Sequence, residues 1–193
     1  MIKKNILIIL LLQSCSLIEL DPNRNIFTAL LNKSDISLID KEYLQSQDSS
    51  YMVLQYENSQ MVLFLSSIDQ NSYEYWIGPN FERVVLQKGI IIEVSGFQNN
   101  FKIRGLVNND YNSKLSFDLS NPLLIGADLI LSDGKSTKTK ACPKKQIIIR
   151  EIPVLKKKYN DFLCFNDNNL LIKTKQRIDP LSKPIILNIF YRY

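Results

Sequence analysis

The chain has 193 residues, of which 45% are hydrophobic and 22% charged, a composition typical of one globular domain rather than of a disordered or fibrous protein. It has no histidine and only three cysteines, which excludes histidine metal sites and the Ser-His-Asp and Cys-His catalytic systems. The formal charge is +5, too small for a dedicated nucleic-acid-binding protein. We therefore expect a non-enzymatic protein without metal or other cofactor and without a nucleic-acid partner.

The first 14 residues have the pattern of a secretory signal peptide. Lys3 and Lys4 form the positive start, residues 6–12 are an unbroken apolar run, and Gln-Ser then leads into Cys15. The run is too short for a permanent transmembrane helix. Residues 12–15, Leu-Gln-Ser-Cys, resemble the lipobox of bacterial lipoproteins, whose cysteine receives diacylglycerol and becomes the first mature residue. The resemblance implies a lipid on Cys15; an ordinary cleaved signal or a buried thiol is the alternative.

A lipid on Cys15 would also determine the compartment. Three acyl chains anchor a protein almost permanently, because each buried methylene contributes about 0.8 kcal/mol. Ser16 follows the cysteine rather than Asp, which in lipoproteins of this type implies sorting to the outer membrane. We expect residues 15–23 to be a lipidated tether and residues 24–193 to be a single β-rich domain on the periplasmic face. Removal of Lys3 and Lys4 leaves 22 basic against 19 acidic residues, a net charge of +3.

Two short amphipathic helices are predicted ahead of the strands. Apolar residues recur on one side of residues 23–33 and again of residues 38–47, at the spacing of a helix. Neither segment is long enough to organise a helical domain. We expect them to plug or flank the β structure that follows.

From Tyr51 onward, short apolar and aromatic runs are separated by Asn, Asp, Gly and Ser about every eight to twelve residues, which predicts an antiparallel meander. The fold class is therefore mainly β, a large curved sheet or open barrel. Asp133-Gly134 is interpreted as a turn, and Trp76 as a core anchor with a sugar-stacking platform as the alternative. The predicted strands are 51–57, 61–68, 73–77, 81–87, 90–95, 102–107, 114–119, 127–131, 146–153, 170–174 and 185–191.

The two remaining cysteines are candidates for a disulfide. An oxidising periplasm favours pairing of Cys142 with Cys164, which lie 22 positions apart. Closing such a loop contributes about 3 kcal/mol when the geometry permits. Two buried reduced thiols are the alternative that the spacing leaves open.

Lysines gather in two places near these cysteines. They offer possible contacts with anionic glycans or phospholipid headgroups, and a solvated hairpin is the alternative. If the disulfide forms, both clusters would be drawn onto neighbouring segments and could form one basic face. The first cluster is Lys135, Lys138, Lys140, Lys144 and Lys145, and the second is Lys156, Lys157 and Lys158.

The middle of the chain resembles the YjbF/GfcB lipoprotein family, which is associated with group 4 capsule and related exopolysaccharide operons. The shared pattern is, in order, a strand ending in Trp, a turn, an apolar strand, a Gly, a further apolar strand and a Ser near a second Gly. It covers about the N-terminal half of the chain. Two positions depart from the family: Ile90 stands where Arg is common, and Val94-Ser95 where Thr is common. The residues that carry it are Tyr75-Trp76-Ile77-Gly78, Val84-Val85-Leu86, Gly89, Ile90-Ile91-Ile92 and Ser95-Gly96-Phe97.

This resemblance implies an outer-membrane-anchored periplasmic accessory protein for capsule or exopolysaccharide assembly or export, with polysaccharide or other export proteins as partners. Two other functions stay open. A carrier would enclose a lipid or glycan ligand in the curved sheet. A glycan-active enzyme would need two convergent carboxylates, and nothing in the sequence singles out such a pair.

Overall fold

The structure is a computed structural model that describes residues 48–97, 100–119, 127–178 and 183–192. The predicted signal peptide, Cys15, the tether and the two predicted helices lie outside these residues. The elements are β1 (Tyr51–Tyr56), β2 (Ser59–Ile68), β3 (Tyr73–Ile77), β4 (Arg83–Gln87), β5 (Ile90–Ser95), β6 (Phe101–Arg104), β7 (Ser113–Leu119), β8 (Ala127–Thr139), β9 (Cys142–Ile152), the 3-10 helix η2 (Pro153–Leu155), β10 (Lys157–Phe165), β11 (Leu171–Gln176) and β12 (Ile185–Phe190).

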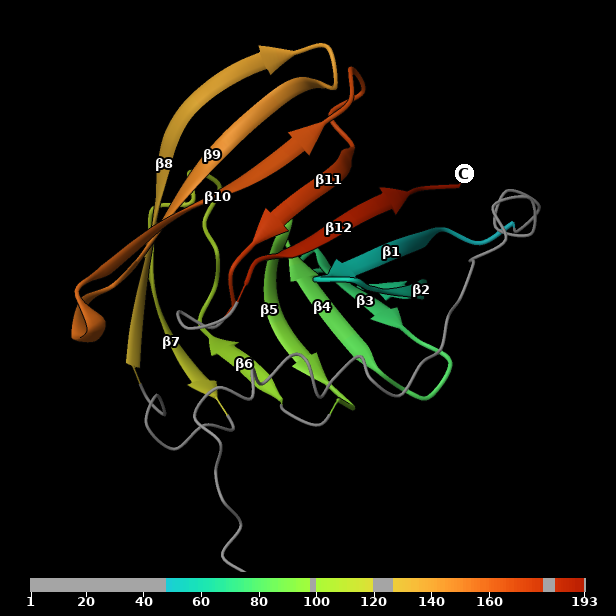
Figure 1. The fold of residues 1–193 in the computed structure, drawn as a ribbon, viewed down its shortest axis with the longest axis horizontal. Coiled ribbons are helices and arrows are strands. Elements are labelled where there is room, and N and C mark those ends of the chain that lie inside the picture. Colours follow the sequence, from blue (N-terminus) through green and yellow to red (C-terminus); the bar gives the residue numbers. More distant parts are fainter. Residues whose placement is uncertain (1–47, 98–99, 120–126, 179–182, 193) are drawn as a thin grey trace, which may run out of the picture.

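The strands form one closed antiparallel barrel (Figure 1). Each strand pairs with its neighbours along the chain, and β1 also pairs with β12, from Tyr51 opposite Phe190 to Gln55 opposite Ile186. The predicted mainly β class and meander order are confirmed, and the sheet closes rather than staying open. Within the described ranges, no helix is long and apolar enough to cross a bilayer.

Every predicted run is a strand, but three local features differ from the prediction. Strand β10 was not predicted, because its first residues are lysines and its apolar residues begin only near Phe162. Strands β8 and β9 extend well beyond the predicted runs as a polar hairpin. Asp133-Gly134 is not a turn: it lies within β8 at an irregularity of the ladder. A Cβ on Gly134 would lie 2.8 Å from the Ile147 carbonyl oxygen, so glycine permits close backbone approach there.

Alternate residues of the strands fill the barrel with apolar side chains. On β12, Ile185, Leu187 and Ile189 are buried while the residues between them are more exposed. Trp76 is completely buried, which confirms it as a core anchor and excludes an exposed stacking platform. The interior of the barrel around these residues is therefore a packed core.

Polar side chains also cross the barrel and join opposite walls. The Nε of Arg150 donates to Asp161 Oδ2 at 2.7 Å, and both side chains are almost completely buried. A second nitrogen of Arg150 donates to Gln176 Oε1 at 3.2 Å. The same oxygen accepts a hydrogen bond of 2.9 Å from the Ile91 backbone nitrogen on β5, and Gln176 donates back to the Gly89 carbonyl. These bonds link β9, β10 and β11 to β5 across the interior.

The up-and-down order gives the barrel two chemically different ends. The turns that follow odd-numbered strands, such as those after β3 and β9, lie at one end, here called the far end. The turns that follow even-numbered strands lie at the other, here called the entry end, because Ser50 precedes β1 there. Arg192 follows β12 at this end, and its backbone nitrogen donates to Ser50 Oγ at 2.9 Å.

Candidate functional site

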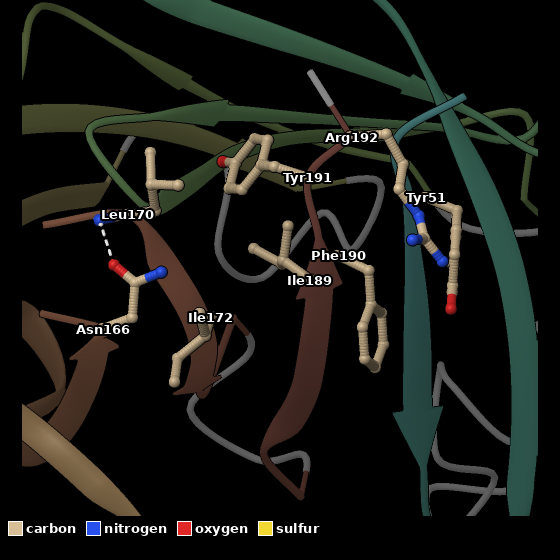
Figure 2. A pocket seen from close by; sticks show the side chains of 8 residues that line it. All are labelled: Tyr51, Asn166, Leu170, Ile172, Ile189, Phe190, Tyr191 and Arg192. Carbon is tan, nitrogen blue, oxygen red and sulfur yellow. Dashed lines mark hydrogen bonds between the residues drawn. The ribbon is translucent and has the colours of Figure 1, made fainter. Parts of the chain in front are cut away.

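A pocket of about 530 Å³ opens at the entry end of the barrel, where β1, β11 and β12 meet the turn between β10 and β11. Figure 2 shows its side chains, which come from these four segments. We call it the rim pocket. It is lined by Tyr51, Asn166, Leu170, Ile172, Ile189, Phe190, Tyr191 and Arg192.

The walls of the rim pocket combine apolar and polar groups. Tyr51 and Phe190 stack with ring centroids 4.8 Å apart and planes 20° apart, on directly paired positions of β1 and β12. At the other side, Asn166 Oδ1 accepts a hydrogen bond of 2.9 Å from the Leu170 backbone nitrogen, which holds the turn that forms that wall. The lining includes one guanidinium, that of Arg192, and no carboxylate. Such a lining suits a small ligand that carries both apolar and polar groups.

Tyr191 connects the rim pocket to a carboxylate in the barrel. Its hydroxyl lies 2.9 Å from each carboxylate oxygen of Glu74 and donates to that group. The indole Nε1 of Trp76 donates to Glu74 Oε2 at 3.0 Å, and the Trp76 and Tyr191 rings meet edge to face at 5.9 Å. Burial raises the pKa of Glu74, and the hydrogen bonds from Tyr191 and Trp76 oppose that rise.

Replacing Glu74 by glutamine is expected to reduce the pH dependence of unfolding. Because the folded pKa of Glu74 is raised, its stabilising contribution is fully present below the unfolded pKa and is lost as pH rises through the folded pKa. Glu74→Gln removes this titration, so the variant should lose less stability than the natural protein on going from acidic to neutral pH. Urea unfolding across that range measures the difference. Parallel pH profiles for the two proteins would contradict a desolvated Glu74.

The first lysine cluster lies on a hairpin that extends past the barrel wall. Figure 1 shows the ends of β8 and β9 curving beyond the neighbouring strands. Lys135, Lys138 and Lys140 are exposed there, and the structure gives them no ion pair with any described residue. We call residues 133–145 the lysine hairpin. The disulfide predicted between Cys142 and Cys164 is present, with Cα atoms 5.5 Å apart, and attaches this hairpin to β10 beside its tip, where Cys142 pairs with Thr139.

The other two lysines of this cluster lie against β10 and the turn that follows it. Lys144 donates to Asn169 Oδ1 at 2.9 Å, and its ammonium lies 5.9 Å from the Phe165 ring centroid. The Lys145 ammonium lies 4.9 Å from the centroid of the Phe162 ring. These contacts fix two cations on the β9 side of the hairpin and leave Lys135, Lys138 and Lys140 in solvent.

The second lysine cluster does not join the first. Lys145 pairs with Cys164 on β10, whereas Lys157 pairs with Ile152 at the opposite end of the same ladder. The two pairs are separated by about 23 Å along the strands. The expectation of one basic face was wrong, because the disulfide joins the entry-end part of β10 and leaves Lys156, Lys157 and Lys158 at the far end.

Sequence reasoning missed the rim pocket and the polar groups inside the barrel. The pocket joins residues from both ends of the chain, Tyr51 with Phe190, and no local motif marks such a pairing. Arg150 did carry a signal: it is a charged residue in an apolar run, on the parity of the buried Ile148 and Ile152. Among the described residues, no group of three carboxylates or thiolates is placed to hold a metal ion.

Comparisons with known proteins support the fold. No protein family and no curated protein matches the sequence. The structure is similar to the crystal structure of the hypothetical lipoprotein YmcC from Escherichia coli (K12), with a TM-score of 0.62 and 11% sequence identity. The similarity covers 81% of this chain and 91% of that one. At this identity it shows a shared barrel fold.

Proposed function

We propose that this chain is a lipoprotein anchored through Cys15 to the periplasmic face of the outer membrane, where it acts without catalysis as an accessory in capsule or exopolysaccharide assembly or export. The observation that carries the proposal is a signal peptide and lipobox pattern ahead of a barrel with the fold of a hypothetical lipoprotein. The polysaccharide role comes from the resemblance of residues 75–97 to the YjbF/GfcB family.

The disulfide supports the compartment in this proposal. Cys142 and Cys164 are bonded in the structure, and stable disulfides persist in oxidising compartments such as the periplasm rather than in the cytosol. Cys15 is then the one cysteine left for lipid attachment, since the chain has three cysteines.

The lysine hairpin supplies the contact surface. It extends from the barrel, carries cations without ion-pair partners among the described residues, and is attached beside its tip by the disulfide. A surface held in place before binding loses less conformational entropy when it binds. Its partner in this proposal is an acidic polysaccharide or an acidic face of another export protein.

Substitution of Cys15 by alanine is expected to move the protein from the membrane fraction to the soluble fraction, because the lipid is its anchor. The intact mass of the natural protein should begin at Cys15 and include the acyl chains, with two further thiols that react only after reduction. A mass that retains residues 1–14, or three thiols that react without reductant, would contradict the anchor and the compartment together.

The polysaccharide role requires a cellular measurement. A strain without this chain should lose surface polysaccharide, and the natural protein should restore it while Cys15→Ala does not. Joint replacement of Lys135, Lys138 and Lys140 by glutamate should also fail, whereas joint replacement of the same three residues by arginine, which keeps the charge, is the matched control and should restore the polysaccharide. Unchanged polysaccharide in the strain without the chain would refute the role.

The rim pocket favours a second function, a carrier for a lipid or glycan ligand. Trp76 is the only tryptophan in the chain, and its ring contacts Tyr191 in the pocket wall. Ligand binding should therefore change the tryptophan fluorescence, and Phe190→Ala should weaken the response because it removes one wall. Titration with envelope lipid extracts and with purified polysaccharide fragments tests this function. No saturable change with either one would exclude it.

A further inference from the structure

A rigid turn at the far end holds an aromatic side chain in solvent. Phe81 lies in the turn between β3 and β4, is 86% exposed and has a φ of 65°. The Gly78 nitrogen donates to the Glu82 carbonyl at 2.7 Å, and the Phe81 nitrogen donates to the Gly78 carbonyl at 3.2 Å. The Glu82 carboxylate accepts hydrogen bonds from the backbone and side chain of Asn80, at 2.9 and 3.1 Å. The turn is thus fixed around a ring that packs against little of the protein.

The neighbouring strand end fixes this turn from behind. Gly96 follows β5 with a φ of 80°, and a Cβ there would lie 2.5 Å from the Phe81 carbonyl oxygen. A bulky residue at positive φ is strained and persists only where its surroundings impose it. Here the surroundings impose an outward-facing phenyl ring that gains no burial. Strained, exposed apolar groups of this kind are typical of contact surfaces.

A second apolar tip lies at the same end. The helix η2 forms the turn between β9 and β10, and its central residue, Val154, is 72% exposed. Lys156 closes the turn with its nitrogen donating to the Pro153 carbonyl at 3.0 Å. The structure gives Lys156 and Lys157 no ion pair with a described residue, while Lys158 lies 3.6 Å from Glu151.

We propose that the far end of the barrel rests on an anionic lipid bilayer, with Phe81 and Val154 at the boundary between headgroups and acyl chains and with Lys156 and Lys157 against lipid phosphates. This inference rests on the proposed lipid anchor, which would keep the barrel beside a bilayer. The Val154 tip has Lys156 and Lys157 beside it, and Phe81 is followed by Glu82 and Arg83. The two apolar tips and those two lysines match the two attractions of such an interface, burial of apolar area and attraction to anionic headgroups.

The opposite end of the barrel is a poorer match for the bilayer. Ile68 and Leu106 are exposed there, at 55% and 61%; Asp69 follows Ile68 directly, and Leu106 lies between Arg104 and Asp110. The lysine hairpin also belongs to this end. In the proposed orientation it points away from the bilayer, toward partners in the periplasm.

The segment between the lipid and the barrel is long enough for this orientation. The barrel begins at Ser50, 35 positions after Cys15. Those positions span at most about 115 Å when extended and about 52 Å as continuous helix. The longest strand, β8, has 13 residues and is about 43 Å long. The segment from Cys15 to Ser50 is therefore long enough to reach from the entry end to a bilayer at the far end.

The test places one fluorescent probe at a time on the two ends. With Cys15 acylated and the other two cysteines paired, an introduced cysteine is the only free thiol. Phe81→Cys and Val154→Cys report on the far end, and Ile68→Cys and Leu106→Cys are matched exposed controls at the entry end. Each labelled, lipidated full-length protein is reconstituted into phosphatidylcholine vesicles with or without phosphatidylglycerol and with nitroxide-labelled lipid as quencher.

With phosphatidylglycerol present, quenching at positions 81 and 154 should exceed that at 68 and 106 by about twofold or more. Joint replacement of Lys156 and Lys157 by glutamate should reduce the difference, and so should high salt. Equal quenching at the two ends, or stronger quenching at 68 and 106, would overturn the inference, as would no dependence on the anionic lipid.

An experiment with a second variant distinguishes failure of this inference from failure of the proposed anchor. The Cys15→Ala chain carrying the same labels is mixed with preformed vesicles. If the natural protein proves to have no lipid, the anchor fails, and quenching at 81 and 154 on mixing still supports the bilayer surface. If the lipid is present and the entry end is quenched instead, the anchor stands and the surface inference fails.

Discussion

Replacement of Asp161 by alanine is expected to destabilise the barrel by about 3–5 kcal/mol, because it leaves the guanidinium of Arg150 buried without its carboxylate. The two side chains are 2% and 1% exposed, so water does not replace the lost partner. Asp161 Oδ1 also accepts a hydrogen bond of 3.1 Å from the Arg177 backbone nitrogen, which the substitution removes as well. Burial raises the pKa of Asp161, and Arg150 opposes that rise.

Urea unfolding measures this effect, and two further variants separate its causes. Lys114→Ala breaks an exposed ion pair with Asp128, where the Lys114 side chain is 68% exposed, and should cost less than about 1 kcal/mol. Joint replacement of Arg150 by methionine and Asp161 by leucine should recover most of the loss, since no buried charge is left unpaired. A small effect of Asp161→Ala would mean that water reaches the pair.

Removal of the disulfide is expected to cost about 3 kcal/mol, the value for opening a loop of this length in the unfolded chain. The bond joins residues 22 positions apart, one beside the tip of the lysine hairpin and the other near the end of β10. Joint replacement of Cys142 and Cys164 by serine should lower the urea midpoint by the corresponding amount. The barrel should remain folded, because β9 and β10 keep their ladder from Lys144 to Ile152.

Reductant provides the internal control for this prediction. It should destabilise the natural protein to the level of the double serine variant and leave that variant unchanged. If reductant has no effect on the natural protein, the two sulfurs are not bonded in the protein as isolated. If it destabilises both proteins equally, its effect does not come from this bond.

The sequence predicted the fold well where burial alternates along a strand. Buried and more exposed residues alternate in β1, β2, β6 and β12, and these strands were placed to within a few residues. Strands β4 and β5 are buried along most of their length, and their short continuous apolar runs marked them instead. β10 was missed because its lysine-rich start lies at the barrel end, where nothing requires apolar residues. The extension of β8 and β9 was missed for the same reason: the hairpin is stabilised by its ladder and disulfide rather than by burial.

The candidate sites were less predictable because they depend on contacts between distant residues. The pairing of Cys142 with Cys164 was predicted, since it needed only two cysteines and an oxidising compartment. The distance between the two lysine clusters depends on which residues of β9 and β10 are paired, and amino-acid composition does not reveal that register. The contact of Tyr191 with Glu74 spans 117 positions, a separation at which sequence patterns carry no signal.

Closure of the barrel also sets the order in which a newly made chain can fold. The first strand and the last are direct neighbours, with Met52 opposite Ile189. A chain that is delivered from its N-terminus leaves β1 and β11 with unpaired edges until its final residues arrive, and pairing across that distance is slow because the intervening chain must first be ordered. Folding is therefore completed only after synthesis or translocation has ended. Until then the protein stays in an open form whose exposed strand edges make it prone to aggregation.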